Sequence, residues 1–249
     1  VAEDQVTNQQ VLKQQLTMLG VRSTFVSNGE QAWQALQNSS FDILLTDIQM
    51  PLLDGLGLAQ KVRKHSAFND LIIIAITANI TKSNIDNCHN CGMNGFLTKP
   101  IELIKLKTLL MEHSQTIVST NEEKHNATEI TSDNFDQLDI TLLKAMLGDD
   151  PTIHCMVFNA FLQTAGEQIK LINAYTASEN YTDLAFQAHG LKSSSKSVAA
   201  LKLAQLCEQV ELLAEKGEGK NDLISDLELC FNDVVTQLKS YCLRYEKRT

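Results

Sequence analysis

The run Leu44-Leu45-Thr46-Asp47-Ile48-Gln49-Met50-Pro51 decides the fold of the first half of the chain. It is an apolar stretch that ends in a carboxylate, and such stretches are typical of strands buried on both faces of a parallel sheet. Short apolar runs recur up to residue 113, with amphipathic segments between them. We expect strands at residues 23–26, 43–46, 72–76 and 95–97, and helices at 8–19, 30–37, 56–65, 82–91 and 103–112.

This alternation of strands and helices predicts an α/β fold, a doubly wound parallel sheet with helices on both faces. Val1-Ala2-Glu3-Asp4 resembles the end of one more strand whose beginning is absent. The expected sheet is therefore five-stranded with a truncated first strand. On this pattern we also expect the chain to be a fragment of a longer protein.

The second half of the chain is expected to be all-α. Residues 114–134 are rich in Ser, Thr, Asn and Glu, which indicates a flexible linker. Beyond residue 135 no strand is expected, and long helices with short connections predict a helical bundle. The apolar spacing places its helices at 140–147, 151–177, 181–198, 201–215 and 222–245. The predicted domains are thus 1–113 and 135–249, joined by the linker 114–134.

Composition narrows the class of protein. The 249 residues carry a formal net charge of -9, which disfavours a nucleic-acid partner. No apolar run is long enough to span a bilayer, so we expect no direct membrane contact. Six cysteines are too few for a disulfide scaffold, which favours a reducing cytoplasm. Cys88-His89-Asn90-Cys91 has the spacing of half a zinc site, but no second pair follows it.

A chemically distinctive set of side chains falls at the strand ends. Ligands of open parallel sheets bind beyond the carboxyl ends of the strands, where this chain carries Glu3, Asp4, Asp47, Thr77 and Lys99. Clustered carboxylates need a cation, and hard oxygen ligands favour Mg²⁺. Asp47 is then a candidate nucleophile towards phosphorus, with Lys99 and Thr77 placed to contact the phosphoryl oxygens. Each residue alone is more typical of a turn or a surface position, so the prediction rests on their coincidence.

With these residues in place, the first half resembles the receiver domain of two-component response regulators. The matching motifs are Glu3-Asp4, Asp47-x-x-Met50-Pro51, Asp54-Gly55, Thr77-Ala78, Cys91-Gly92-Met93, and Phe96 with Lys99-Pro100. The resemblance implies that Asp47 is the phosphoacceptor and that Thr77 and Phe96 are the switch pair reporting its phosphorylation. It implies Mg²⁺ at Asp47, bound directly by Asp4, through water by Glu3 and through the backbone carbonyl of Gln49. It also implies a cis peptide bond before Pro100.

A histidine in the second half has an unusual setting. In the helix expected at 181–198, apolar and small residues at 184, 188, 191, 195 and 198 follow the spacing of a buried seam. His189 lies one position off this seam, on a stripe with Ala185, Lys192 and Lys196 that should face solvent or the edge of the seam. Small neighbours leave its imidazole accessible as a nucleophile, and Lys192 lies one turn on to offset phosphate charge. Taken alone, a solvated histidine on a polar helix face is the commoner explanation.

The motif Ala188-His189-x-Leu191-Lys192 also resembles histidine-containing phosphotransfer (HPt) domains, four-helix bundles with one acceptor histidine. Ser193 and Ala199 stand where that family often has glycine. A receiver, a linker and an HPt domain together resemble the carboxyl-terminal segment of hybrid sensor histidine kinases of the BvgS/EvgS type.

That resemblance implies a phosphorelay: a kinase histidine upstream in the same parent chain passes phosphate to Asp47, then to His189, and then to a separate response regulator. The segment has no ATP-binding motif of its own, so the kinase activity belongs to the parent. By the same resemblance the parent is bacterial and anchored in the inner membrane, with this segment in the cytoplasm.

Two other functions remain open from the sequence. The receiver can act as a phosphorylation-dependent binding switch beside a helical bundle in which His189 is idle. Alternatively, Asp47 can serve a phosphatase acting on small phosphate esters. Such enzymes usually carry a second aspartate two positions after the nucleophile, and this chain has Gln49 there.

Overall fold

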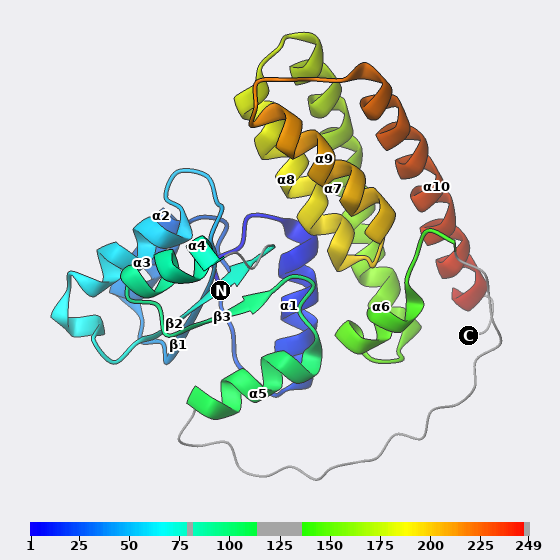
Figure 1. Ribbon diagram of the computed structural model, residues 1–249. Coiled ribbons are helices and arrows are strands. Elements are labelled where there is room, and N and C mark those ends of the chain that lie inside the picture. Colours follow the sequence, from blue (N-terminus) through cyan, green and yellow to red (C-terminus); the bar gives the residue numbers. More distant parts are fainter. Residues whose placement is uncertain (79–81, 114–135, 247–249) are drawn as a thin grey trace.

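The computed structural model describes residues 1–78, 82–113 and 136–246 (Figure 1). Within these ranges, helices and strands alternate in the first half and only helices follow in the second, as predicted. The predicted linker at 114–134 lies outside the described residues. None of the described helices combines the length and apolar character needed to cross a membrane.

The sheet has three parallel strands in the order β1-β2-β3, with β1 at Ile43–Asp47, β2 at Ile72–Thr77 and β3 at Gly95–Thr98. Among the described residues, the expected count of five strands is therefore not confirmed. The segments expected as two further strands contribute isolated bridges only, from Ala2 to Val26 on one side and to Thr46 on the other. The reason is that each of these pairings extends over a single residue rather than a continuous ladder.

Helices cover both faces of the sheet, so the doubly wound arrangement is confirmed. Alternate strand residues point to opposite faces. Leu45, Ile74 and Ile76 pack with α1 and α5, whereas Leu44 and Ile73 pack with the helices on the opposite face. The bounds are α1 Val6–Met18, α2 Gly29–Asn38, α3 Gly55–Arg63, η1 Ser66–Phe68, α4 Lys82–Asn90 and α5 Leu103–His113.

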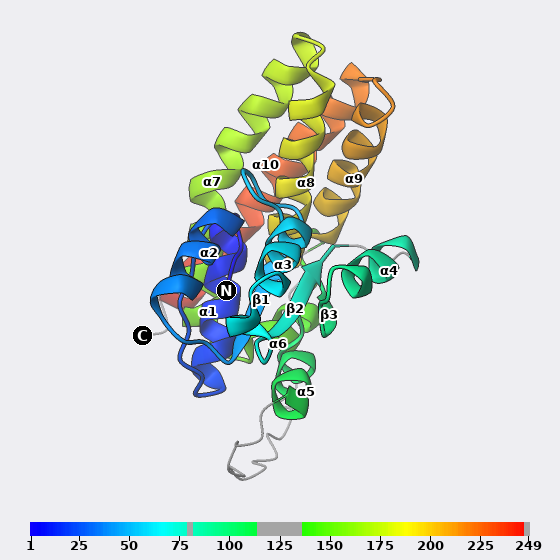
Figure 2. The same ribbon diagram turned by 90° about the vertical axis from the view of Figure 1, so that its left-hand side faces the viewer.

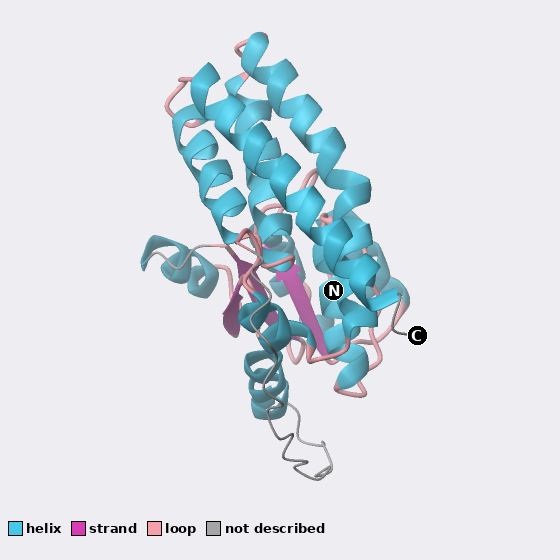
Figure 3. Cartoon of the chain, turned by 90° about the vertical axis from the view of Figure 1, so that its right-hand side faces the viewer, coloured by secondary structure: helices cyan, strands magenta, loops and turns pink. Residues whose placement is uncertain are grey.

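The second half consists of five helices with short connections (Figure 3). Asp139, Asp150 and Asn180 accept hydrogen bonds from the first turns of α6, α7 and α8, which explains where these helices begin. α7 packs on α8 and α10, and α9 packs on the same two helices, around buried Phe158 and Phe161. The bounds are α6 Ile140–Leu147, α7 Pro151–Ala177, α8 Tyr181–Ser197, α9 Leu201–Ala214 and α10 Asn221–Glu246.

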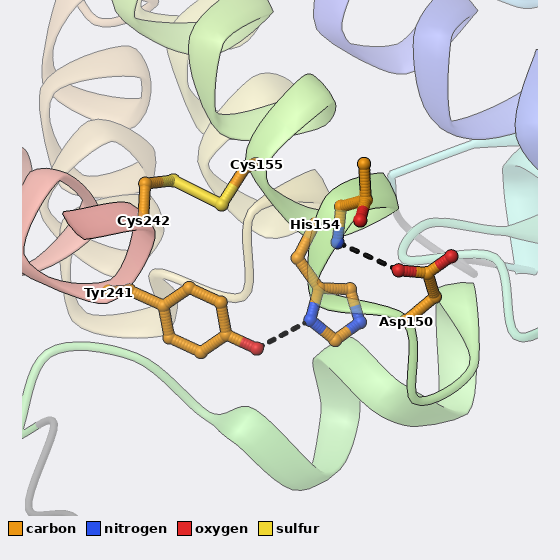
Figure 4. The surroundings of a disulfide bond; sticks show 6 residues. Asp150, His154, Cys155, Tyr241 and Cys242 are labelled. Carbon is orange, nitrogen blue, oxygen red and sulfur yellow. Dashed lines mark hydrogen bonds between the residues drawn. A yellow bond between two sulfur atoms is a disulfide. The ribbon is translucent and has the colours of Figure 1, made fainter. Parts of the chain in front are cut away.

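One disulfide joins the long helices. Cys155 of α7 and Cys242 of α10 are bonded, with their Cα atoms 5.6 Å apart (Figure 4). This bridge cannot be predicted from the sequence, because the two cysteines become neighbours only through the packing of α7 on α10. The remaining four cysteines are buried free thiols, and a single bridge does not make a disulfide scaffold.

The two halves pack against each other through α1. Figure 1 shows α1 between the sheet and the helical region, and Figure 2 shows it below α7; α1 contacts α6, α7 and α8. Val11 of α1 belongs to the hydrophobic core of the helical region. The buried amide of Gln15 donates to the carbonyl oxygen of Ile101 at 2.6 Å and to that of Met146 at 3.0 Å. The helical region is therefore docked on the α/β half through buried apolar and polar contacts.

Candidate functional site

The sheet brings the acidic residues of the first half together. The backbone N–H of Asp47, at the end of β1, donates to the carbonyl of Ala2, so the segment carrying Glu3 and Asp4 lies directly beside Asp47. Glu3, Asp4 and Asp47 each offer a carboxylate oxygen, and these oxygens lie within 4.8 Å of one another. Asp47 is only 3% exposed and Glu3 is fully buried.

The loop after Asp47 turns back tightly over the strand end. A Cβ atom at Gly55 would lie 2.1 Å from the carbonyl oxygen of Asp47, so only glycine permits this approach. Asp54 then caps α3 by accepting from the N–H of Gly57 at 2.7 Å. Gln49 lies beside the site, and its backbone N–H donates to Oδ1 of Asp47 over 3.2 Å. The sequence Asp54-Gly55 thus holds the loop that borders the candidate nucleophile.

Lys99 is the cation at the centre of this cluster. Its Nζ lies 2.5 Å from Oδ2 of Asp47 and 2.7 Å from Oε2 of Glu3. Burial by itself would lower the pKa of Lys99, but the two carboxylates raise that pKa overall. The Lys99–Pro100 peptide bond is cis, as the receiver resemblance implied. Lys99 is therefore a fixed, buried ammonium group in contact with Asp47.

The acidic cluster has the charge and the donor atoms of a hard-cation site. Burial raises the pKa of Glu3 to about 8, with the attraction of Lys99 opposing and the charge of Asp47 adding to the shift. Burial, and then the charge of Asp47, also raise the pKa of Asp4. Oε2 of Glu3, which pairs with Nζ of Lys99 at 2.7 Å, accepts no further hydrogen bond from the described residues. Three carboxylates opposed by one ammonium group fit an added divalent cation with oxygen ligands.

The two residues of the expected switch pair lie on neighbouring strands. Thr77 ends β2, is buried, and accepts the backbone N–H of Lys99 at its carbonyl oxygen over 2.8 Å. Phe96 lies on β3, opposite Ala75, and packs partly buried against the core beneath α2, α3 and α4. Thr77 therefore adjoins the Lys99 cluster, and Phe96 lies in the apolar layer beside it.

Helix α8 brings a further side chain to the cluster. Lys99 Nζ donates to Oγ of Ser193 at 2.9 Å, although the two residues are 94 positions apart in the chain. Lys196, one turn on, donates from Nζ to the carbonyl oxygen of Ala78 at 3.4 Å. On the same face, a Cβ atom at Gly190 would lie 2.8 Å from Nε2 of Gln5. The helix that carries His189 thus lies against the strand ends that carry Asp47.

His189 is held in one orientation by a carboxylate of α9. Its Nδ1 lies 2.8 Å from Oε1 of Glu211, and the imidazole remains partly exposed. Because a carboxylate only accepts hydrogen bonds, the ring hydrogen resides on Nδ1 and the lone pair on Nε2. Burial would raise the pKa of Glu211, but its bonds from His189 and Lys192 hold that pKa below its usual value.

The stripe around His189 is less exposed than expected. Lys192 is only 2% exposed and pairs closely with Oε2 of Glu211, with Glu208 as a second carboxylate at 3.8 Å. Its ammonium group therefore turns inward to α9 instead of outward to solvent. The predicted seam of α8 is confirmed, because residues 184, 188, 191, 195 and 198 are all buried.

Sequence reasoning missed Glu211 and Asn8. A signal for Glu211 was present: Ala204, Cys207 and Ala214 form the buried stripe of α9, and Glu211 occupies the 3-4-3 spacing with them. A carboxylate at a buried seam position calls for a charged partner. Asn8 gave no such signal, because it lies within the first turn of an ordinary amphipathic helix.

Comparison with known proteins agrees with this geometry. The profile of the response regulator receiver domain matches residues 1–111, and that of the Hpt domain matches residues 156–241. Sensor protein EvgS of Escherichia coli O157:H7 is 27% identical over 90% of this chain and 18% of its own length. The osmosensing histidine protein kinase SLN1 of Saccharomyces cerevisiae is 36% identical over 45% of this chain and 10% of its own length.

Among solved structures, the receiver domain of the sensor histidine kinase PA1611 from Pseudomonas aeruginosa PAO1, with a magnesium ion coordinated in its active site cleft, is 34% identical. It covers 45% of this chain and 92% of its own, with a TM-score of 0.43. The chain spans less than a fifth of the length of the two sensor kinases. The two profiles account for both halves of the fold, in the order that phosphorelay segments of hybrid sensor kinases show. The chain therefore joins a response regulator receiver domain to an HPt domain, the make-up of a phosphorelay segment of a hybrid histidine kinase.

Proposed function

We propose that Asp47 accepts a phosphoryl group from a kinase histidine and that His189 takes it from Asp47 for delivery to a separate response regulator. One observation carries this proposal. Ser193 lies one turn of α8 beyond His189 and contacts Lys99, which in turn contacts Asp47. Four residues of helix span about 6 Å along the axis, so the two acceptor groups lie within reach of a small adjustment of the docked helix.

In the first step, a carboxylate oxygen of Asp47 attacks the phosphorus of the upstream phosphohistidine. A P–O bond to Asp47 forms and the P–N bond breaks, and the imidazole leaves with its electron pair. Lys99 is already in contact with Asp47 and neutralises charge on the phosphoryl oxygens, while Thr77 borders the same point. The donor is the kinase core of the parent chain.

Glu3, Asp4, Asp47 and the backbone carbonyl of Gln49 are the groups that would hold Mg²⁺. The fit is supported by the carboxylate oxygens of Glu3, Asp4 and Asp47, which lie within 4.8 Å of one another, and by the excess of these carboxylates over the ammonium group of Lys99. When bound, the ion supplies positive charge to the transferring phosphoryl group. The chain itself holds the three carboxylates close together around Lys99, so their negative charge would attract the cation.

In the second step, Nε2 of His189 attacks the phosphorus on Asp47. A P–N bond forms, the P–O bond breaks, and Asp47 leaves as a carboxylate that Lys99 stabilises. Positive charge develops on the imidazole, and Glu211 stabilises it through the hydrogen bond to Nδ1. Lys192 holds the Glu211 carboxylate in place through an ion pair. Lys192 therefore acts on the transfer step indirectly, by positioning Glu211. An aspartate of a separate response regulator then accepts the phosphoryl group.

The finer features of the architecture belong to the same proposal. The bridges at Ala2 and Val26 support a receiver sheet with five strand positions, and the packing of α7 to α10 supports a four-helix HPt bundle. We place the receiver at 1–113, the linker at 114–134 and the HPt domain at 135–249. Thr77 and Phe96 would report phosphorylation to the receiver surface. The parent would add the kinase core and a membrane anchor, with this segment on the cytoplasmic side.

The test loads the full chain with a small phosphoryl donor such as acetyl phosphate in the presence of Mg²⁺. Acyl phosphates are labile to base, whereas phosphohistidine is labile to acid and stable to base. Wild type, Asp47→Asn and His189→Gln are compared. A base-stable pool that requires both residues is expected. If only base-labile phosphate forms, and its amount is the same in wild type and in His189→Gln, the receiver is instead a binding switch beside an idle helical region.

A further inference from the structure

Asn8 on α1 sits where the receiver site and the HPt helix meet. It is buried, and its side chain contacts Glu3 close by in the chain and Ser193 and Ser197 from the other half. Nδ2 donates to Oε1 of Glu3 at 2.8 Å and to Oγ of Ser193 at 2.8 Å. Oδ1 accepts from Oγ of Ser197 at 2.7 Å. Both hydrogens and one acceptor site of this amide are therefore used.

The two serines form a regular pattern on α8. Ser193 and Ser197 are four residues apart, so they lie one above the other on the same helix face. Ser193 Oγ accepts from Asn8 and also from Lys99 at 2.9 Å. A continuous chain of polar contacts thus runs from Ser197 through Asn8 and Ser193 to Lys99 and Asp47.

We propose that Asn8 is a specificity-determining residue that recognises the HPt helix through two hydroxyl groups placed four and eight residues after the acceptor histidine. The inference rests on the proposed relay. A slip of α8 by one residue would rotate both serines about 100° away from Asn8 and leave its buried amide with only the Glu3 hydrogen bond of the three described. Asn8 therefore fixes the register that keeps His189 one turn from the Lys99 contact.

The occupant of this surface is the HPt helix of the same chain. Other contacts of α1 reach the same domain: Val11 lies in its apolar core, and Gln15 donates to Met146. Just before α1, Gln5 accepts from Gln168 at 3.1 Å. A helix with apolar residues at the two serine positions would remove two of the three hydrogen-bond partners of the buried Asn8 amide and leave Glu3. Docking is thus disfavoured between a receiver and an HPt helix when one of them lacks the asparagine or the two serines.

The experiment compares four serines of one helix in the full chain. Ser193→Ala and Ser197→Ala, singly and together, are set against Ser194→Ala and Ser195→Ala, whose hydroxyls do not contact Asn8. Rapid quenching measures the passage of phosphate from already loaded Asp47 to His189. The double variant is expected to transfer about three- to tenfold more slowly, the size of one hydrogen bond, while the two controls keep the wild-type rate.

Two further readouts separate recognition from a merely structural effect. Asn8→Ala should be as slow as the double serine variant, and combining all three changes should add nothing further. The side-chain amide resonance of Asn8 should shift in the double variant and stay in place in Ser194→Ala. Full additivity, or a wild-type transfer rate together with an unmoved resonance, would overturn the role of Asn8 while the relay stands.

Failure of the relay is recognised separately. If wild type places no phosphate on His189, the proposed function is overturned, and the inference that rests on it falls too. Mixing Asp47→Asn chains with His189→Gln chains tests whether the helix that docks on Asn8 comes from the same chain or from a second copy. Transfer that occurs only between chains, and that vanishes on dilution of wild type, would overturn recognition within one chain.

Discussion

His189 and Glu211 form a hydrogen bond of 2.8 Å between Nδ1 and Oε1, across the contact of α8 with α9. The second oxygen of the same carboxylate is paired with Lys192. Glu211 therefore receives two donors from one face of α8 and is fixed by both. This arrangement assigns the nucleophilic lone pair of the imidazole to Nε2.

Replacing Glu211 by alanine should slow transfer to His189 by about ten- to a hundredfold, the usual cost of losing the group that orients a functional histidine. Without the carboxylate, the imidazole hydrogen distributes between both nitrogens and the ring is no longer held. The ¹⁵N chemical shifts of the ring check the tautomer, and quenched-flow transfer checks the rate. Glu208→Ala is the control, because Glu208 contacts Lys192 at 3.8 Å but not His189. Equal effects of the two substitutions would assign the role to Lys192 instead.

The sequence predicted the parts of the site that depend on local patterns. Apolar runs place the strands, and carboxyl ends of parallel strands share one edge, so the meeting of Asp47 with Lys99 and Glu3 follows from order along the chain. The contact of Asn8 with Ser193 spans 185 positions and depends on how two finished surfaces fit. No periodicity encodes such a fit. The two outer strands are not confirmed for a related reason, because a continuous ladder at an extended segment such as 23–26 depends on its pairing partners, and the structure shows a single bridge there.

Lys196, rather than Lys192, is placed to add positive charge at the interface between the domains. Its Nζ lies 3.4 Å from the carbonyl of Ala78, next to Thr77, whereas Lys192 is turned to α9. Burial, and then the charge of Lys192, lower the pKa of Lys196. Lys196→Met should slow transfer from Asp47 to His189 by about tenfold, equivalent to about 1.4 kcal/mol of transition-state stabilisation. Lys196→Arg should restore most of it, and exposed Lys202→Met should change nothing; an unaffected Lys196→Met would exclude an electrostatic role.

The Cys155–Cys242 disulfide closes a segment of 87 residues and should stabilise the helical region by restricting its unfolded state. Under oxidising conditions, Cys155→Ser with Cys242→Ser should lower the free energy of unfolding by about 2–4 kcal/mol. With a thiol reductant present, wild type and the double variant should unfold at the same denaturant concentration. Cys207→Ser and Cys230→Ser are not suitable controls, because both of these free thiols are buried in the core of the same region. A wild type insensitive to reductant would contradict the bridge.

His154 should make the helical region less stable in mild acid. Its Nε2 donates to the carbonyl of Gly148 at 2.8 Å, so its Nδ1 accepts from the hydroxyl of Tyr241 at 2.7 Å (Figure 4). Burial lowers the pKa of His154 from about 6.5. The unfolded chain then binds the extra proton first, so stability is retained above pH 6.5 and falls below it, by up to about 1.4 kcal/mol per pH unit. Denaturation of the full chain between pH 5 and 8 should show this slope in wild type and in the exposed-residue control His65→Gln. His154→Gln, which cannot titrate, should lack it, and an unchanged slope in that variant would assign the acid sensitivity to other groups.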